Sequence, residues 1–269
     1  MLEGVLSKLS MRLRQLVNQF SSDSVLIYQM GKVGSTSLEE SLSDALHVHT
    51  LYGNPPCKFH KRRWKKHPVA LLKKLIGDLL KRSLIRRRKH VKIISLVREP
   101  YSRNVSMFFQ DLPYWMVHYQ EAYDYDSRKE GAEFLHKTFE QVYDHFYFDR
   151  WFDDELKRLT GIDVFSYPFD KELGYKILRE GRYEVLLVKL EKLQEAHQAI
   201  EAFMGYSFEM KETNKSERKW YACIYREFKR TFHPSETYLA SLYATKTVRH
   251  FYSDGEIDGF KKKFSVPRP

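Results

Sequence analysis

The sequence is poor in cysteine and has no long apolar run, and each absence excludes a class of protein. Its two cysteines, Cys57 and Cys223, form no CxxC pair and lie beside no plausible set of metal ligands. They argue against a disulfide framework and against structural zinc, and they fit a reducing cytoplasm best. No apolar run approaches the roughly 20 residues that span a bilayer. We therefore expect a globular protein without a membrane-spanning helix.

The amino-terminal residues lack the uninterrupted apolar centre of a signal peptide. A plain helix over residues 1–22 is expected, although an Arg-bearing amphipathic start is also a property of transit peptides. The predicted location is the cytoplasm, with peripheral contact to a membrane as an option.

Acidic residues are nearly absent from one segment. Between Lys58 and Lys92 the chain has fifteen lysines and arginines and a single acidic residue, Asp78. The whole chain has a formal net charge of +11, so the remainder, with 31 basic and 34 acidic residues, is close to neutral. A cationic block of this kind attracts nucleic acid, acidic lipid or acidic glycan.

Within that segment, residues 69–88 have the periodicity of an amphipathic helix. One apolar stripe is expected, with lysines and arginines opposite, formed by Leu72, Leu75, Ile76, Leu79 and Leu80. The favoured interpretation is that this stripe packs on the core and leaves a solvated cationic face. Two functional alternatives stay open: the face guides an anionic glycan, or it lies on acidic lipid.

Short β-branched runs alternate with helix-length periodic stretches along the chain. Strands are predicted at 24–29, 91–97 and 184–190, with weaker candidates at 46–50 and 163–168. Helices are predicted at 36–45, 69–88, 100–110, 133–146, 152–159 and 192–203. This alternation favours an α/β three-layer sandwich with a central parallel sheet covered on both faces. We expect a single domain over residues 1–269, with a basic helical insertion at 58–92 and a helical extension at 208–269.

The stretch "SVLIYQMGKVGSTSL" combines a predicted strand, two glycines, a lysine, three hydroxyl residues and the start of a helix. Glycines let the backbone approach a ligand closely, and the beginning of a helix favours an anion. Lys32 adds a positive charge beside the same place. The order is not that of a Walker A loop, in which lysine follows the second glycine, because Lys32 precedes Gly34. The stretch therefore predicts an anion site that needs no metal.

A second polar cluster follows the predicted strand at 91–97. Arg98 stands at the end of this strand, and Pro100 suits the first position of a helix on which Arg103 and Ser106 share a face. Arg98 and Ser106 could converge on a second phosphate. The alternative is a surface pair between Arg98 and Glu99 ahead of a capping proline.

Two anion sites at the ends of neighbouring strands resemble those of sulfotransferases that use 3′-phosphoadenosine 5′-phosphosulfate (PAPS), carbohydrate sulfotransferases in particular. The 5′-phosphosulfate loop of that family carries a lysine, then small residues and Ser/Thr, as "KVGSTS" does here. Its 3′-phosphate motif, R-[DE]-P-x-x-R-x-x-S, is matched by Arg98, Glu99, Pro100, Arg103 and Ser106, with glutamate where aspartate is common. "YEVLLVKLEKL" and "VRHFYSDGEIDGFKKKF" are looser matches to its late strand and its ending. "ERKWYACIYREF" is similar to a bacterial group described as capsular polysaccharide synthesis proteins.

The resemblance implies a P-loop-like sulfotransferase fold and transfer of a sulfuryl group from PAPS to a carbohydrate hydroxyl. The product would be adenosine 3′,5′-bisphosphate (PAP), and the family needs no metal. Lys32 would contact the bridging oxygen of the donor. The remaining donor-binding residues would be Gly31, Val33, Gly34, Ser35, Thr36 and Ser37 at the phosphosulfate, and Arg98, Arg103 and Ser106 at the 3′-phosphate.

The base for the acceptor proton is predicted among two histidines. His47 and His49 stand two apart on a candidate strand, so they share one face. A histidine titrates near neutral pH and can accept a hydroxyl proton. His49, nearer the carboxyl end of the strand, is the first candidate and His47 the second, and packing roles for either stay open.

Two other classes of function compete with the sulfotransferase hypothesis. A non-catalytic polyanion-binding or RNA-binding protein would use residues 58–92, although no RNA-recognition motif supports nucleic acid as a partner. A small-molecule P-loop kinase would require ATP and magnesium, which the order of the loop residues does not predict. The acceptor itself, whether polysaccharide, glycolipid or small hydroxylated molecule, stays open.

Overall fold

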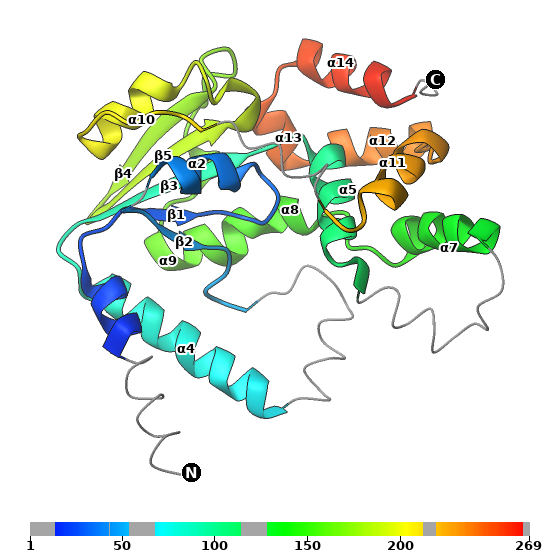
Figure 1. The fold of residues 1–269 in the computed structure, drawn as a ribbon. Coiled ribbons are helices and arrows are strands. Elements are labelled where there is room, and N and C mark those ends of the chain that lie inside the picture. The colour runs from blue at the N-terminus through cyan, green and yellow to red at the C-terminus, as the bar shows by residue number, and fades with distance from the viewer. Residues whose placement is uncertain (1–13, 43, 54–67, 114–127, 212–218, 266–269) are drawn as a thin grey trace.

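The computed structural model describes residues 14–42, 44–53, 68–113, 128–211 and 219–265, apart from the side chains of residues 35 and 128–132 (Figure 1). At its centre is a five-stranded sheet in the order β2-β1-β3-β5-β4. The strands are β1 (Leu26–Tyr28), β2 (Leu46–Val48), β3 (Val91–Val97), β4 (Tyr175–Glu180) and β5 (Tyr183–Lys189). Four strands run parallel, and β4 pairs antiparallel with β5 at one edge.

Helices lie on both faces of the sheet (Figure 1). On one face are α2 (Ser35–Ser41) and α10 (His197–Met204). On the other are α4 (Pro68–Arg87) and the run of α8 (Tyr147–Trp151), the π-helix η1 (Phe152–Lys157) and α9 (Arg158–Thr160). The 3₁₀ helix η3 (Leu190–Lys192) follows β5 directly.

The remaining helices gather beside the carboxyl ends of the strands (Figure 1). They are α5 (Pro100–Gln110), α7 (Arg128–Gln141), α11 (Ala222–Thr231), α12 (Glu236–Tyr243), α13 (Lys246–Phe251) and α14 (Asp254–Ser265). One hydrophobic cluster connects this group with the sheet, and it runs in sequence from Phe20 to Phe264.

The parallel part of the sheet forms where the sequence predicts it. β3 coincides with the predicted 91–97, and β1, β2 and β5 lie within one residue or inside their predicted ranges. Six of the seven residues of β3 are buried, as expected for a strand covered on both faces. The helical character after residue 208 is confirmed for the described residues.

Two predictions about the sheet are wrong. Residues 163–168 form no strand, because Asp163 caps a short 3₁₀ helix, Val164–Ser166, by accepting from the Phe165 N–H. The antiparallel strand β4 was missed, although Gly181 and Arg182 between β4 and β5 form a two-residue hairpin connection. Gly181 has φ +56°, which suits the tight turns that join twisted antiparallel strands.

The apolar stripe predicted on residues 69–88 does not pack on the core. Leu72, Leu75, Ile76 and Leu79 are exposed, and of the predicted stripe only Leu80 packs against the hydrophobic cluster. The helix contacts the domain instead through its carboxyl-terminal part, where Leu84 and Ile85 are buried.

None of the helices in the described ranges combines the length and the apolar character that a membrane span requires. Of the helix predicted at 1–22, residues 14–21 are helical, and residues 1–13 lie outside the described part of the chain. Cys223 is exposed with a free thiol, whereas Cys57 lies outside the described residues.

Candidate functional site

The strand order places a switch point between β1 and β3. From β1 the chain passes to β2 on one side, and it returns to β3 on the other side. In open α/β sheets, ligands bind outside the carboxyl ends of the strands at such a point. The loop after β1 carries Lys32, and the residue directly after β3 is Arg98. The two predicted anion motifs therefore meet at the carboxyl ends of β1 and β3.

The loop after β1 has an unusual backbone held by two arginines. Lys32 has φ +70° and is the only non-glycine residue with positive φ in the described ranges. The Gly31 carbonyl accepts from Arg103 Nε at 3.1 Å, and the Lys32 carbonyl accepts from Arg98 Nη1 at 2.9 Å. Left-handed backbone at a lysine costs free energy and persists only when the surroundings impose it, as they often do at functional sites.

The Lys32 ammonium lies among other cations. The pKa of Lys32 is lowered to about 8, mainly by burial and in addition by the Lys219 ammonium, which lies within hydrogen-bonding reach, and by the Arg98 guanidinium. Asp111, at the end of α5, opposes this effect. Three positive groups held together at one place are electrostatically unfavourable unless an anion joins them.

Buried polar atoms without partners lie around the same loop. They are Arg103 Nη2, Asp111 Oδ2 and Gln29 Nε2. The pKa of Asp111 is raised to about 6, because the effect of burial exceeds the opposing effect of the Arg103 and Lys32 cations. A buried polar atom without a partner is rare and indicates a missing hydrogen bond to water, ion or ligand.

Arg98 also lines a cavity of about 240 Å³ between α5, α11 and α14. Further cationic or titratable lining groups are Lys229, His233 and Lys263, and Ser102 adds a hydroxyl. The rest of the wall is largely aromatic: Tyr101, Tyr225, Phe232 and Phe264. Ser106, the predicted partner of Arg98, is half-buried on α5 and does not line this cavity.

Arg103 is fully buried, so it supports the loop from inside the protein. Besides the Gly31 carbonyl, its guanidinium reaches Asn104 Oδ1 at 3.1 Å and the Tyr143 hydroxyl at 3.2 Å, and it lies over the Tyr147 ring. In this arrangement Arg103 orients the loop, and no surface of its side chain reaches solvent.

The remaining loop residues predicted to bind the donor are placed as follows. Val33 is fully buried, Gly31, Gly34, Thr36 and Ser37 are half-buried, and the side chain of Ser35 lies outside the described part. Gly34, with φ +86°, ends the loop and begins α2. A Cβ at Gly34 would meet Leu190 Cδ1 at 2.3 Å, so glycine is required both by the backbone and by the close approach of η3.

His47 and His49 lie side by side at the end of β2, as their spacing predicts. Their ring centroids are 4.1 Å apart, and His47 Nδ1 is 3.0 Å from Glu39 Oε1. His49 Nδ1 is 3.2 Å from the Gln29 carbonyl oxygen. Because a carbonyl only accepts, Nδ1 carries the proton, and a neutral His49 keeps its Nε2 lone pair available.

Both histidines are kept neutral by their surroundings. The pKa of His47 is lowered to about 4, mainly by burial and in addition by His49, against the opposing effect of Glu39. The pKa of His49 is lowered by desolvation and by the Lys32 and Arg103 cations, although the hydrogen bond to Gln29 opposes this. His49 as a residue is nevertheless exposed, which leaves it open to an acceptor from solvent.

Glu155 fixes the segment that follows His49, and the sequence analysis did not identify it. Its carboxylate, on the π-helix η1, accepts from the Tyr28 hydroxyl, from Leu51 N–H at 2.7 Å and from Tyr52 N–H at 3.1 Å. Glu155 is fully buried, and burial raises its pKa against these hydrogen bonds. Single π turns inside helices are often associated with functional sites, and this one connects β1 with the end of β2.

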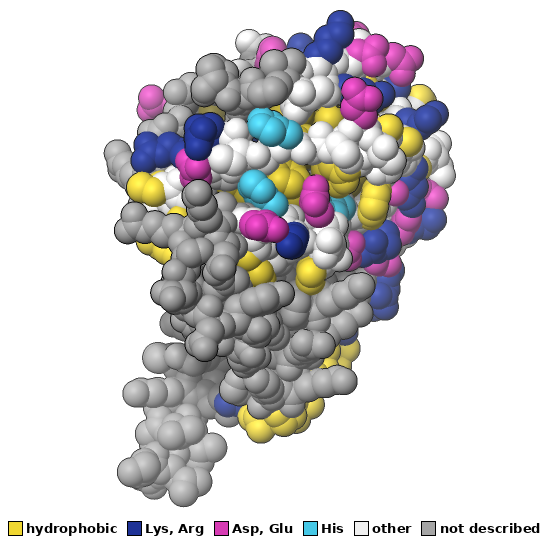
Figure 2. Space-filling view, turned by 90° about the vertical axis from the view of Figure 1, so that its right-hand side faces the viewer, with side chains coloured by type: hydrophobic (Ala, Val, Ile, Leu, Met, Phe, Trp, Pro, Cys, Tyr) yellow, Lys and Arg dark blue, Asp and Glu magenta, His cyan; other side chains and the backbone are white. Residues whose placement is uncertain are grey.

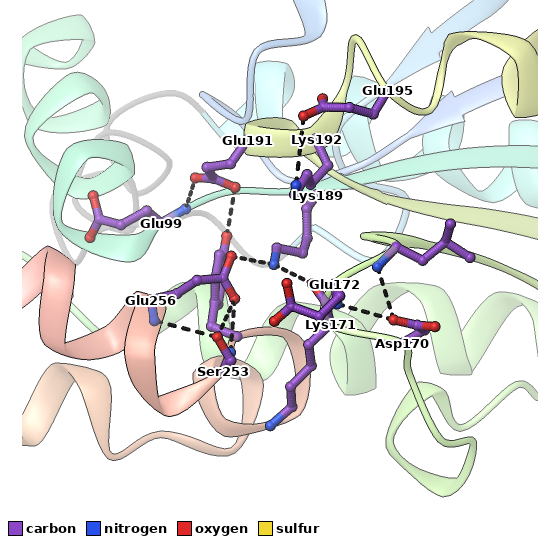
Figure 3. A network of polar contacts seen from close by, with 12 residues as sticks. Glu99, Asp170, Lys171, Glu172, Lys189, Glu191, Lys192, Glu195, Ser253 and Glu256 are labelled. Carbon is purple, nitrogen blue, oxygen red and sulfur yellow. Dashed lines mark hydrogen bonds and ion pairs between the residues drawn. The ribbon is translucent and has the colours of Figure 1, made fainter.

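A polar network fixes the neighbouring strand ends (Figure 3). Glu99 caps α5 by accepting from Tyr101 N–H and Ser102 N–H, so it does not form the surface pair with Arg98 that was an alternative. Glu191, after β5, accepts from Glu99 N–H at 2.8 Å. Lys189, fully buried, donates to Glu256 on α14 and to the Lys171 carbonyl (Figure 3). The ends of β3 and β5 are thereby tied to the carboxyl-terminal helices.

Several residues around the site come from distant parts of the sequence, and these were missed. Lys219 and Lys263 lie in "ERKWYACIYREF" and "VRHFYSDGEIDGFKKKF", and Lys229 directly follows the first of these stretches. The available signal was the family likeness of these two stretches, which does not tell which of their lysines faces the sheet. Within the described residues, no cluster of three or more His, Cys, Asp or Glu is arranged to hold a metal ion.

Comparison with known proteins gives one family. Residues 123–253, just under half of the chain, match the family model described as "Putative capsular polysaccharide synthesis protein". This range contains β4, β5, Lys219 and α11, whereas the loop after β1 and Arg98 lie outside it. No curated protein and no solved structure matches the chain significantly. The likeness to capsular polysaccharide synthesis proteins that "ERKWYACIYREF" indicates is thus confirmed, and the likeness to sulfotransferases stays a prediction.

Proposed function

We propose that the protein is a PAPS-dependent sulfotransferase that sulfates a hydroxyl group of a carbohydrate. The observation that carries this proposal is the convergence of Lys32, Lys219 and Arg98 at the carboxyl ends of β1 and β3. Lys32 itself has a left-handed backbone, and buried polar atoms that lack partners lie around the same loop. Such a place favours a multiply charged anion.

The residues present fit the two charged ends of PAPS. Lys32, Lys219 and the residues from Gly31 to Ser37 would hold the phosphosulfate end, next to the beginning of α2. Arg98 donates to the Lys32 carbonyl and also lines the neighbouring cavity. It would bind the 3′-phosphate together with Ser106 or Ser102. Arg103 would act indirectly by fixing the Gly31 carbonyl. The aromatic wall of the cavity offers surface for a base ring.

PAPS would supply the sulfuryl group, with PAP as the leaving product. Lys32, already placed and partly desolvated, would stabilise negative charge on the leaving phosphate without reorganising. His49 would hold the acceptor hydroxyl through Nε2 and take its proton, while the Gln29 carbonyl keeps Nδ1 protonated. This assigns His49 ahead of His47, whose ring faces Glu39.

The proposed acceptor is a polysaccharide or glycolipid. The family matched by residues 123–253 carries capsular polysaccharide synthesis in its description, and this supports a carbohydrate substrate. An exposed His49 is compatible with an acceptor too large to be enclosed.

Calorimetric titration with PAP tests donor binding. Wild type should bind PAP tightly without magnesium, and Lys32→Ala and Arg98→Ala should each weaken binding about 10- to 100-fold, the worth of one hydrogen bond to a charged group. Lys73→Ala, which removes an exposed lysine on α4, is the matched control and should bind as wild type does. Equal affinity in all four proteins, or a preference for ATP with magnesium, would overturn the proposal; the second result would indicate a kinase.

Transfer of label from [³⁵S]PAPS to a panel of glycans tests the base. His49→Asn retains a side chain that can donate to the Gln29 carbonyl but removes Nε2, so kcat should fall by about 10²- to 10⁴-fold. PAP affinity should stay within about twofold, and His47→Asn should have a smaller effect. Loss of activity in His47→Asn alone would assign the base to His47, and full activity in both variants would remove histidine from the mechanism.

A further inference from the structure

The exposed apolar stripe on α4 is concentrated on one element. Among the described residues, ten large hydrophobic side chains are exposed, and half of them are on this helix. They are Val69 at 64%, Leu72 at 57%, Leu75 at 48%, Ile76 at 57% and Leu79 at 60% exposure. Spacings of three and four residues place them along one side of the helix. Contiguous exposed apolar surface of this kind marks an interaction site.

The exposure does not result from a helix that fails to pack. Leu84 and Ile85 are buried, Arg82 Nη1 donates to the Leu51 carbonyl at 2.9 Å, and Arg86 Nη2 donates to the Tyr52 hydroxyl at 2.9 Å. The carboxyl-terminal half of α4 is thus fixed to the domain, and the amino-terminal half extends away from the sheet (Figure 1). Figure 2 shows hydrophobic side chains exposed at the lower end of the molecule, at the level where Figure 1 places the beginning of α4.

The charge of α4 identifies the surface that fits it. The helix contains six basic residues and one acidic residue, Asp78. Asp78 is buried and its charge is neutralised within the helix by Lys74 and by Lys81, the latter at 3.6 Å. Lys73 and Arg87 are exposed on the same helix as the stripe. A helix that exposes large apolar side chains together with lysine and arginine is complementary to an interface that is apolar inside and anionic at its rim.

We propose that α4 docks the protein onto the surface of a bilayer that contains acidic lipids. The stripe would enter the boundary between headgroups and acyl chains, while the flanking lysines and arginines would contact lipid phosphates. A soluble polyanion such as RNA or an acidic glycan would use the charges but not the apolar stripe. A second copy of this chain would bring the same cationic helix against itself, and like charges oppose such an interface.

Flotation of the full-length protein with lipid vesicles tests the proposal. Vesicles of 70% phosphatidylcholine and 30% phosphatidylglycerol should carry the wild type upward. Vesicles of phosphatidylcholine alone should bind it at least about tenfold more weakly, since each basic residue contributes through the negative surface potential of the acidic lipids. Binding to the acidic vesicles should weaken in about 0.5 M salt but not vanish, because the apolar contribution is not screened.

Matched variants separate the stripe from general hydrophobicity. Leu72→Gln/Ile76→Gln/Leu79→Gln should lower the vesicle partition coefficient by about tenfold or more while the circular dichroism spectrum and melting temperature stay close to those of the wild type, because each of these side chains is more than half exposed and glutamine has a helix propensity similar to that of leucine. Leu173→Gln, at a residue 48% exposed elsewhere on the surface, is the control and should partition as wild type does.

Three results would overturn the proposal. The first is absence of wild-type binding to acidic vesicles. The second is a lowered melting temperature of the triple variant, which would mean that another part of the chain covers the stripe. The third is a stable dimer in light scattering that the triple variant dissociates, which would assign the stripe to contact between copies. PAP binding by the triple variant should be normal, so this test fails or succeeds independently of the proposed sulfotransferase activity.

Discussion

At the scale of single residues, Lys32 connects the fold with the proposed chemistry. Its positive φ turns two carbonyls toward Arg98 and Arg103, and its ammonium lies beside Lys219. The sequence motif identified Lys32 and Arg98 correctly as neighbours at one sheet edge. It could not reveal Lys219 and Asp111, since their approach depends on how α5 and the carboxyl-terminal helices pack.

The lowered pKa of Lys32 predicts that anion binding depends on pH. Below about pH 8 Lys32 is charged in the free protein, and above it the free protein loses the proton that a bound anion favours. PAP affinity should therefore fall by up to about tenfold per pH unit above pH 8. Lys32→Arg, whose guanidinium stays charged, should bind with little change between pH 7 and 9. Titration calorimetry at several pH values measures both profiles, and identical profiles would contradict the assignment of Lys32.

Asp111 should shift this profile. Its carboxylate raises the pKa of Lys32 against the effect of the neighbouring cations. Asp111→Asn removes that charge, so the decline of PAP affinity should begin at a lower pH than in the wild type. Affinity at pH 6.5, where Lys32 stays protonated in both proteins, should differ much less. A profile that moves to higher pH would mean that Asp111 competes with the ligand instead.

Gly34 should tolerate no side chain. Alanine there combines φ +86° with a Cβ placed 2.3 Å from Leu190 Cδ1, and about 1–3 kcal/mol of stability should be lost in urea unfolding. Gly77→Ala in the interior of α4, where a Cβ meets nothing within 4 Å, should instead stabilise by about 0.5–1 kcal/mol. Equal effects of the two substitutions would show that the close approach of Leu190 is unimportant.

At the scale of elements, the sequence predicts what local pattern determines. β3 and α5 have their predicted bounds because β3 is a run of buried apolar residues and α5 starts with a capping Glu99 and Pro100. The stripe on α4 shows the limit of this reasoning. Periodicity tells that apolar residues share a face, but the surroundings decide whether that face is covered, and here it is not.

The π-helix η1 is an element whose importance only the structure reveals. Glu155→Gln would replace one accepting carboxylate oxygen by an amide that must face N–H donors of Leu51 or Tyr52. We expect a loss of about 1–3 kcal/mol in urea unfolding. Asp153→Asn, an exposed change on the same element, should cost under about 1 kcal/mol although it weakens the pair with Lys246. A larger effect at Asp153 than at Glu155 would contradict the role given to the buried network.

At the scale of the whole molecule, the candidate site is shared between distant parts of the chain. The strand ends supply Lys32 and Arg98, the segment before α11 supplies Lys219, and α11 and α14 supply Lys229 and Lys263. The buried pair of Lys189 with Glu256 fixes α14 to the end of β5 (Figure 3). Topology explains why Lys32 and Arg98 could be predicted from the sequence and the lysines from later in the chain could not. Loops after neighbouring parallel strands lie together at the carboxyl ends of those strands, whereas no such rule places the carboxyl-terminal helices.

Binding of PAP should therefore stabilise both parts together. In hydrogen–deuterium exchange, PAP should slow exchange at residues 31–37 and at α11 (Ala222–Thr231) and leave α4 unchanged, because the ligand would join cations of the sheet edge to those of α11. Adenosine 5′-phosphate lacks the 3′-phosphate that Arg98 would hold, so it should protect residues 31–37 weakly and α11 less. Protection by PAP that is confined to the loop after β1 would mean that the cavity beside Arg98 takes no part in donor binding. Protection confined to α11 would mean that Lys32 and Lys219 do not form the phosphosulfate site.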